Sequence, residues 1–397
     1  MVPMNEYKIE LERLRELYDE GLYSAAFYAS KVSRVQLSSY ETFQTIPFTH
    51  KSELRNTTVE DRTATAPGDV YGVFSSSGTT GDKTFYIYNN IDKRVHEDCV
   101  RTYLGELGVC TTDLGAVMAP VDTGVMAHTM MWEFTTMGAG YVNCPVPTSE
   151  NILNVVSSLP VTVIATRPSI ASSIASDSHA RAVARASKVR MLAVGGGFLS
   201  NARRQLIEDA WDAPCYNMFG MSEVFGPMAA ECLQKSRFHY RKDYLMIEVI
   251  DPVTLCPVPH GELGVAVYTT LWSKGFPLLR YWTDDMLRLV DEPCRCGSDL
   301  PRFEFCGRLD DCYTIKGRYV FPQDVEEILI PAGCWGAYQV ERNPQGIKIV
   351  EEGELSDKDG VRRRLEELFE TPVDIQTVPV GTLAYDGHAR RFSDARR

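Results

Sequence analysis

Two short apolar runs, at residues 161–166 (VTVIAT) and 189–194 (VRMLAV), constrain the fold of this chain more than any other feature. The sequence between them is rich in Ala and Ser and has helical character. Short strands that alternate with helices are typical of a mainly parallel sheet in the α/β class. The chain has 397 residues, of which 44% are hydrophobic, so we expect two or three domains with a sizeable core.

The pattern changes twice in the second half of the chain. From about residue 244, strands and turns such as Pro259-His260-Gly261 replace the alternation and predict an antiparallel or barrel-like subdomain. After residue 307, helical strings (VEEIL, VRRRLEELFE) lie between short strands. We therefore expect a large N-terminal α/β domain with a β-rich subdomain over residues 1–307. A small, mobile C-terminal α+β domain is expected over residues 308–397.

Charge and cysteine usage exclude several classes of protein. The 41 basic and 53 acidic residues give a formal net charge of −12, which argues against a chain built mainly to bind nucleic acid or anionic lipid. No stretch approaches the ~18 apolar residues of a membrane span, and residues 1–30 lack the apolar core of a signal peptide. The 11 scattered cysteines do not resemble a secreted disulfide framework. We expect a cytoplasmic, soluble protein without nucleic-acid or membrane partners, and its oligomeric state stays open.

Residues 75–84 (SSSGTTGDKT) form a loop rich in hydroxyl groups between two apolar runs. Glycines allow the backbone N–H groups to turn toward an anion, while hydroxyls and the lysine add donors and charge. The string is not a Walker A motif, because no GxxxxGK[ST] pattern fits it. A flexible Ser/Gly linker is the alternative, but the apolar runs on both sides argue against it.

Four further strings follow the loop in a fixed order: residues 216–227 (YNMFGMSEVFGP), 280–285 (RYWTDD), 307–311 (GRLDD) and 316–326 (KGRYVFPQDVE). Together with the loop they resemble the motifs of the adenylate-forming superfamily, which includes acyl-CoA synthetases. The second and fifth motifs are most similar to those of phenylacetate–CoA ligases. The resemblance extends over about residues 70–394.

This resemblance implies an ATP-dependent, AMP-forming ligase that activates an aryl or related carboxylic acid as acyl-AMP and passes it to coenzyme A. Catalysis of such a phosphoryl reaction consists mainly of positioning and charge neutralisation. By resemblance, Ser222 contacts the α-phosphate, Glu223 binds Mg²⁺ and Phe219 stacks on adenine. The full ATP-binding set implied in this way is Ser76, Ser77, Gly78, Thr79, Thr80, Gly81, Lys83, Gly196, Phe219, Gly220, Asp285 and Arg308.

The family also implies an acyl pocket, a hinge and a thiol channel. A Met- and Gly-rich strip holds Met126, His128 and Trp132, which are either walls of the acyl pocket or ordinary helix packing residues. By resemblance, Asp310 is the hinge about which the small domain turns. Lys316 and Gly317 then line the channel for coenzyme A.

A Cys-x-Cys-Gly string at residues 294–297 is a candidate metal knuckle. Thiolates and imidazole form tetrahedral zinc sites, and Cys232 and His239 could complete a set with Cys294 and Cys296. Buried reduced cysteines are the simple alternative, and a DNA-binding zinc ribbon is a second one that the acidic composition does not support. Phenylacetate–CoA ligase-like proteins with similar strings favour a structural zinc ion.

One departure from the family lies near the C-terminus. The string DGHARRFSD at residues 386–394 places His388 where the family has a catalytic lysine. Histidine is mostly neutral at pH 7, whereas a cation is needed beside the phosphate. Three alternatives follow: adenylation is slow, Arg390 or Arg391 supplies the cation instead, or the protein acts on a different pair of substrates.

Two alternatives to the CoA ligase therefore stay open. The first is an adenylating enzyme that transfers the acyl group to an amine or to a carrier-protein thiol. The second, motivated by His388, is a nucleotide-binding protein without ligase activity.

Overall fold

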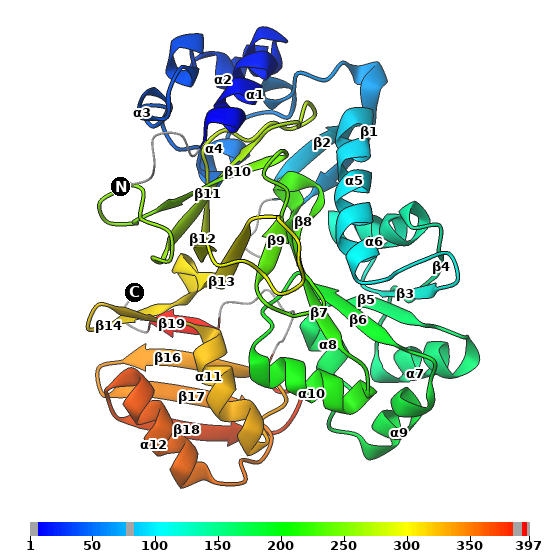
Figure 1. Cartoon of the computed structure of the whole chain (residues 1–397). Coiled ribbons are helices and arrows are strands. Elements are labelled where there is room, and N and C mark those ends of the chain that lie inside the picture. The colour runs from blue at the N-terminus through cyan, green and yellow to red at the C-terminus, as the bar shows by residue number, and fades with distance from the viewer. Residues whose placement is uncertain (1–6, 77–82, 384–390, 395–397) are drawn as a thin grey trace. The chain divides into compact units, whose positions relative to one another are not determined.

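The structure is a computed structural model that describes residues 7–76, 83–383 and 391–394 (Figure 1). The chain forms two compact units, each assembled from segments that are distant in sequence. The predicted boundary between residues 307 and 308 divides the chain differently and stays a prediction. The first unit comprises Met1–Thr112, Val121–Tyr141 and Met218–Cys306, and the second comprises Asp113–Pro120, Val142–Asn217 and Gly307–Arg397.

The first unit is built on antiparallel strands. Their order is β10-β11-β12-β13-β9-β8-β7, and β1 and β2 form a separate antiparallel pair. The predicted antiparallel region after residue 244 is thereby confirmed. Its strands are β1 (Val70–Ser75), β2 (Phe85–Asn89), β7 (Cys215–Met221), β8 (Gly226–Glu231), β9 (Phe238–Tyr240), β10 (Leu245–Ile250), β11 (Gly264–Thr270), β12 (Tyr281–Val290) and β13 (Arg302–Arg308).

Helices of the first unit pack on two sides of this framework. The N-terminal helices share a core with β10 through Leu14, Leu17 and Met246. Asn89 caps the longest helix by accepting the N–H groups of Ile91 and Asp92. The helices are α1 (Lys8–Asp19), α2 (Ala26–Ala29), α3 (Tyr40–Phe43), α4 (Lys51–Arg55), α5 (Asn90–Glu106) and α6 (Val125–Thr136).

The second unit contains the predicted parallel sheet. Residues 161–166 and 189–194 form most of β5 and β6, which pair in parallel and are buried along their whole length. Apolar residues of the intervening helices cover these strands, which confirms the α/β class. The elements are β3 (Leu114–Met118), β4 (Gly140–Asn143), α7 (Ser149–Ser158), β5 (Val163–Thr166), α8 (Pro168–Ser172), α9 (Ser178–Ala186), β6 (Met191–Gly195) and α10 (Asn201–Trp211), with strand order β6-β5-β3-β4.

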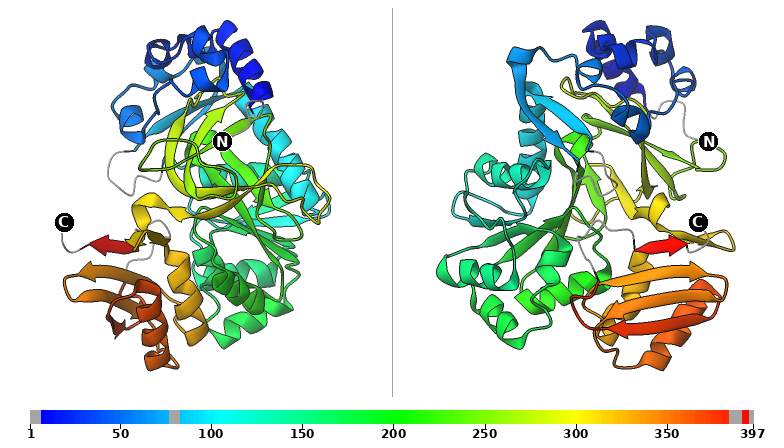
Figure 2. Two further views of the ribbon diagram at one scale, coloured as in Figure 1. Left: turned by 60° about the vertical axis from the view of Figure 1, so that its left-hand side comes forward. Right: turned by 180° about the vertical axis from the view of Figure 1, so that it is seen from behind.

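Residues 307–397 contribute a four-stranded sheet with the order β18-β17-β16-β19. Two helices cover one face of it, and the other face is seen uncovered from behind (Figures 1 and 2). Val361, Leu365 and Phe369 lie on one side of α12 and pack into this small core. The elements are β14 (Tyr313–Ile315), β15 (Arg318–Val320), α11 (Pro322–Leu329), β16 (Tyr338–Asn343), β17 (Gly346–Glu352), α12 (Lys358–Phe369), β18 (Val373–Val378) and β19 (Phe392–Asp394).

Among the described helices, none combines the length and the apolar character needed to cross a lipid bilayer.

Candidate functional site

A buried carboxylate, Glu223, is the centre of the candidate site in the first unit. Its Oε1 accepts hydrogen bonds from the Tyr86 hydroxyl at 3.0 Å and from the Tyr281 hydroxyl at 3.2 Å. The Lys51 ammonium lies 3.3 Å from the same oxygen. Three elements, α4, β2 and β12, thus place donors around one acidic side chain.

The surroundings of Glu223 keep it ionised. Burial by itself opposes the charged form, but the Lys51 charge and hydrogen bonds from the backbone and from Tyr86 leave the pKa of Glu223 below its usual value. The burial of Tyr86 next to this carboxylate raises the pKa of its hydroxyl, which therefore stays protonated and able to donate. The site offers an anionic oxygen ligand at neutral pH.

The backbone that presents Ser222 and Glu223 depends on two glycines. A Cβ atom at Gly220 would lie 2.3 Å from the carbonyl oxygen of Gly226, so β7 and β8 could not approach each other as they do. Gly226 has φ +105°, and a Cβ there would lie 2.5 Å from the His96 ring. Tyr88 donates a hydrogen bond to the Ser222 carbonyl, which fixes the turn between the strands.

Phe219 lies on β7, before this turn. Its ring centroid is 5.2 Å from those of Phe303 and Phe305 and 5.5 Å from that of Phe238. The side chain is only partly buried, so aromatic packing fixes its position without enclosing it. Its predicted role in stacking on adenine stays a prediction.

The predicted strand, loop and strand around residues 75–84 are borne out at both ends. β1 and β2 pair with Ser75 opposite Phe85, which is unlike a flexible linker. Ser76 is buried and exchanges backbone and side-chain hydrogen bonds with Thr84, while Lys83 donates to Thr123 Oγ1 at 2.8 Å. The remaining predicted loop residues, Ser77, Gly78, Thr79, Thr80 and Gly81, lie outside the described residues.

The motif at residues 280–285 contains an arginine that stabilises the fold and a buried aspartate. Arg280 binds Glu248 through two nitrogens, at 2.9 Å and 3.0 Å, and also donates to the carbonyls of Gln44 and Ile46, so it fixes the fold. Asp285 on β12 is buried, and its N–H donates to Thr283 Oγ1. The structure places Asp285 on the strand that also carries Tyr281, a partner of Glu223.

The three candidate acyl-pocket residues all lie half-buried on α6. The Trp132 ring stacks on Tyr71 with centroids 4.9 Å apart. The His128 ring lies 5.3 Å from that of Phe74, and its Nε2 is 3.3 Å from the Asp122 carbonyl oxygen. The surroundings are aromatic, and the predicted role of Met126, His128 and Trp132 as pocket walls stays a prediction.

The second unit carries the other predicted site residues. Gly196 follows β6 with φ +67°, and Arg308 Nε lies 2.9 Å from Asp310 Oδ1. Lys316 is exposed and ion-paired with Glu370, and it forms the β14–β15 turn together with Gly317. His388 and Arg390 lie outside the described residues.

Arg391, the other cation considered as a substitute for the family lysine, is engaged elsewhere in this structure. Its side chain is buried and ion-paired with Glu326.

Lys51 was not predicted from the sequence, because the surrounding string HKSELR has the appearance of an ordinary capped surface helix. Only the fold brings Lys51 to Glu223.

The four predicted zinc ligands come together in the first unit. Ligand atoms of Cys232, His239, Cys294 and Cys296 all lie within 4.8 Å of one another. Cys232 Sγ is 3.7 Å from Cys294 Sγ, and Cys296 Sγ is 3.6 Å from His239 Nε2. A tetrahedron with Zn–S bonds of ~2.3 Å has edges of ~3.8 Å, so the donors fit a zinc ion.

Comparisons with known proteins show which family the chain belongs to. The sequence profile of the family described as AMP-binding enzyme matches residues 24–270. The phenylacetate-coenzyme A ligase of Thermus thermophilus is 31% identical over 306 residues, which cover 73% of this chain and 66% of that relative. The chain thus spans slightly less than two thirds of this relative.

Solved structures share the fold. A 2-hydroxyisobutyryl-CoA ligase in the postadenylation state, in complex with R3-HIB-AMP, has a TM-score of 0.83 at 20% identity, covering 97% of this chain and 89% of the other. The same ligase in its thioesterification state, with 2-HIB-AMP and CoA, has a TM-score of 0.68 at 21% identity, covering 98% and 89%.

The family profile and the curated relatives identify an adenylate-forming protein. The chain belongs to the AMP-binding enzyme family and is phenylacetate–CoA ligase-like. Its curated relatives are named phenylacetate-coenzyme A ligases, and the solved 2-hydroxyisobutyryl-CoA ligase structures share its fold.

Proposed function

We propose that this protein activates a carboxylic acid with ATP and transfers the acyl group to coenzyme A. A carboxylate oxygen of the acid attacks the α-phosphate of ATP, so that an acyl-AMP forms and pyrophosphate leaves. The thiol of coenzyme A then attacks the acyl carbonyl, and AMP leaves. In the structure, the observation that carries this proposal is the buried, ionised Glu223 between the hydroxyls of Tyr86 and Tyr281.

Glu223 is the proposed magnesium ligand. An ionised carboxylate is the oxygen ligand that Mg²⁺ prefers, and two tyrosine hydroxyls restrain its orientation. Bound Mg²⁺ supplies charge neutralisation on phosphate oxygens. Ser222, one residue earlier, is proposed to contact the α-phosphate.

Lys51 is proposed as a cation for the phosphate groups. It is 42% exposed at its side chain and has one carboxylate oxygen at 3.3 Å, so it can reorient toward an anion at little desolvation cost. Such a residue offsets the lack of a permanent cation at His388. The geometry supports this role because Lys51 reaches the same carboxylate that is proposed to hold the metal.

The remaining ATP contacts are proposed from the motifs alone. Asp285 and Arg308 are proposed to bind the ribose, and Asp310 to act as the hinge. The aromatic surroundings of Trp132 favour an aryl or related acid, with Met126 and His128 as further walls. The other proposed residues are Ser76, Ser77, Gly78, Thr79, Thr80, Gly81, Lys83, Gly196, Phe219 and Gly220 for ATP, with Lys316 and Gly317 for coenzyme A.

A structural zinc ion is proposed at Cys232, His239, Cys294 and Cys296. It would tie the end of β8 and strand β9 to the loop between β12 and β13, all within the first unit. Thiolate and imidazole donors of this kind favour zinc over the harder magnesium ion.

Transfer to an amine or to a carrier-protein thiol is the second candidate function, since the first half-reaction is the same. We also propose a cytoplasmic location, supported by scattered cysteines that do not resemble a secreted disulfide framework, and no nucleic-acid partner, supported by the acidic composition.

The decisive experiment measures pyrophosphate release with a panel of aryl and alkyl acids, followed by product analysis with coenzyme A, amines and carrier protein. Acid-dependent pyrophosphate release is expected, with a thioester as product when coenzyme A is present. A protein that binds ATP but releases no pyrophosphate with any acid would instead be a nucleotide-binding protein without ligase activity.

A further inference from the structure

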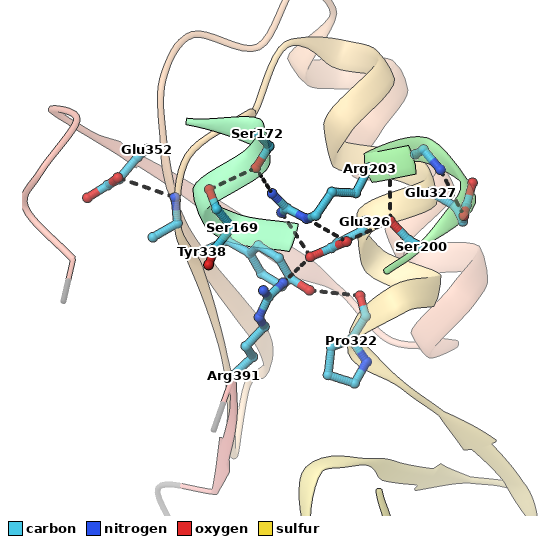
Figure 3. A network of polar contacts seen from close by, with 12 residues as sticks. Ser169, Ser172, Ser200, Arg203, Pro322, Glu326, Glu327, Tyr338, Glu352 and Arg391 are labelled. Atoms are coloured by element: carbon cyan, nitrogen blue, oxygen red, sulfur yellow. Dashed lines mark hydrogen bonds and ion pairs between the residues drawn. The ribbon is translucent and has the colours of Figure 1, made fainter. Parts of the chain in front are cut away.

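A buried ion network joins the residues after 307 to the helices α8 and α10 of the second unit (Figure 3). Glu326 on α11 is fully buried, and both of its carboxylate oxygens have charged or hydroxyl donors. Arg203 on α10 donates to Oε2 at 3.1 Å and to Oε1 at 2.9 Å. Ser200, the N-cap of α10, donates to Oε2 at 2.6 Å.

The network continues on both sides of this carboxylate. Arg203 also donates to Ser172 Oγ on α8 at 3.0 Å. Arg391, next to β19, donates to Glu326 Oε1, and its guanidinium lies 4.6 Å from the centre of the Tyr338 ring. Figure 3 shows the two arginine side chains approaching the carboxylate from different directions.

Asp311 makes a second set of contacts with the chain at Arg391. Its Oδ1 accepts the backbone N–H groups of Arg391 and Phe392 at 3.1 Å and 3.0 Å. The chain after 307 is therefore fastened to itself by Asp311 and to α10 by Glu326. Only the second of these attachments depends on Arg203.

The buried charge of Glu326 is stabilised by the two arginines beside it. Burial opposes ionisation of Glu326, but the charges of Arg203 and Arg391 outweigh it and lower its pKa to about 2. Buried charges that lose a partner without gaining water are strongly destabilising. Opening of this contact would therefore have to expose Glu326 and Arg203 to water together.

We propose that Arg203 and Glu326 are positioning residues for acyl-AMP formation: their ion pair holds residues 307–397 on α10 during that step and separates for thioester formation. This inference rests on the proposed function. It is supported by the two states of the 2-hydroxyisobutyryl-CoA ligase, since this chain matches the postadenylation state better than the thioesterification state at nearly equal coverage. The two structures of that relative therefore differ from each other in arrangement.

The test separates the two half-reactions in Arg203→Met, which leaves Glu326 paired with Arg391. The pyrophosphate burst with the acid selected in the panel is expected to slow by about tenfold or more, because a docking interaction made before that step is lost. Thioester formation from supplied acyl-AMP and coenzyme A is expected to stay equal or become faster.

Arg190→Met is the matched control. It breaks the Arg190–Asp113 ion pair, 2.7 Å long, which lies in the same unit and involves no residue after 307. Both half-reactions of this variant are expected to remain close to those of the wild type.

A parallel fall of both half-reactions in folded Arg203→Met, or an unchanged burst, would overturn the proposal. If that variant does not fold, Arg203→Lys keeps the charge but loses the two-pronged contact with Glu326. The same imbalance between the half-reactions is expected there, and an unchanged ratio would refute the proposal. A wild-type protein without acid-dependent pyrophosphate release would instead refute the proposed function, and the positioning role with it.

Discussion

Replacing Lys51 with methionine tests the candidate site most directly. Methionine keeps the unbranched apolar stem of the side chain but removes the charged head, which lies 3.3 Å from Glu223 Oε1. We expect Lys51→Met to fold, because the lysine head is partly exposed and no buried charge of opposite sign loses all its donors. Tyr86 and Tyr281 still donate to Glu223.

The magnitude follows from the separation of the charges and their exposure. At an effective dielectric constant of ~20, two unit charges 3.3 Å apart attract by roughly 5 kcal/mol. Solvent screening at the 42% exposed lysine reduces its net contribution to folding to about 1 kcal/mol. In the closed complex with ATP, the loss of one cation beside the phosphate is expected to slow adenylation about 100-fold, or ~2.7 kcal/mol.

The assay is the pyrophosphate burst at saturating ATP, with Lys31→Met as the control. Lys31 pairs with Glu53 on α4 at 2.6 Å instead of with Glu223, so its variant should adenylate like the wild type. The pKa of Glu223 is also expected to rise in Lys51→Met, since burial is then less opposed. An adenylation rate within about twofold of the wild type in folded Lys51→Met would refute the assigned role.

Glu223→Gln is expected to abolish Mg-ATP-dependent acyl-AMP formation with little change in circular dichroism, and near-normal turnover would exclude the metal role. The purified protein should contain about one zinc ion per chain by elemental analysis. Cys296→Ser should lower the melting temperature more than the activity of the folded fraction. Protein that is prepared without chelator and contains no zinc would contradict this prediction. His388→Lys should speed the pyrophosphate burst at pH 7–8 and keep it fast up to about pH 9, because a lysine side chain stays charged over this range. An alanine variant as fast as wild type would show that His388 takes no part in the step.

Local patterns in the sequence predicted much of the fold. The strands β5 and β6 follow from short apolar runs between helical segments, because burial of a parallel strand on both faces demands such runs. The pairing of β1 with β2 follows from the two apolar runs on either side of the short hydroxyl-rich loop. The clustering of Cys232, His239, Cys294 and Cys296 was also predictable, since few residue types bind zinc and two of the four are separated by a single residue.

Only the tertiary structure decided which charged residues become functional neighbours. Glu326 and Glu327 are identical and adjacent in sequence, yet the first is fully buried between two arginines and the second is half-buried and accepts the N–H of Ala202. Arg203 lies 123 residues from Glu326, and Lys51 is still further, 172 residues, from Glu223 along the chain. A charge is recognised as buried and paired only after packing removes its water, and packing depends on contacts that no local pattern contains.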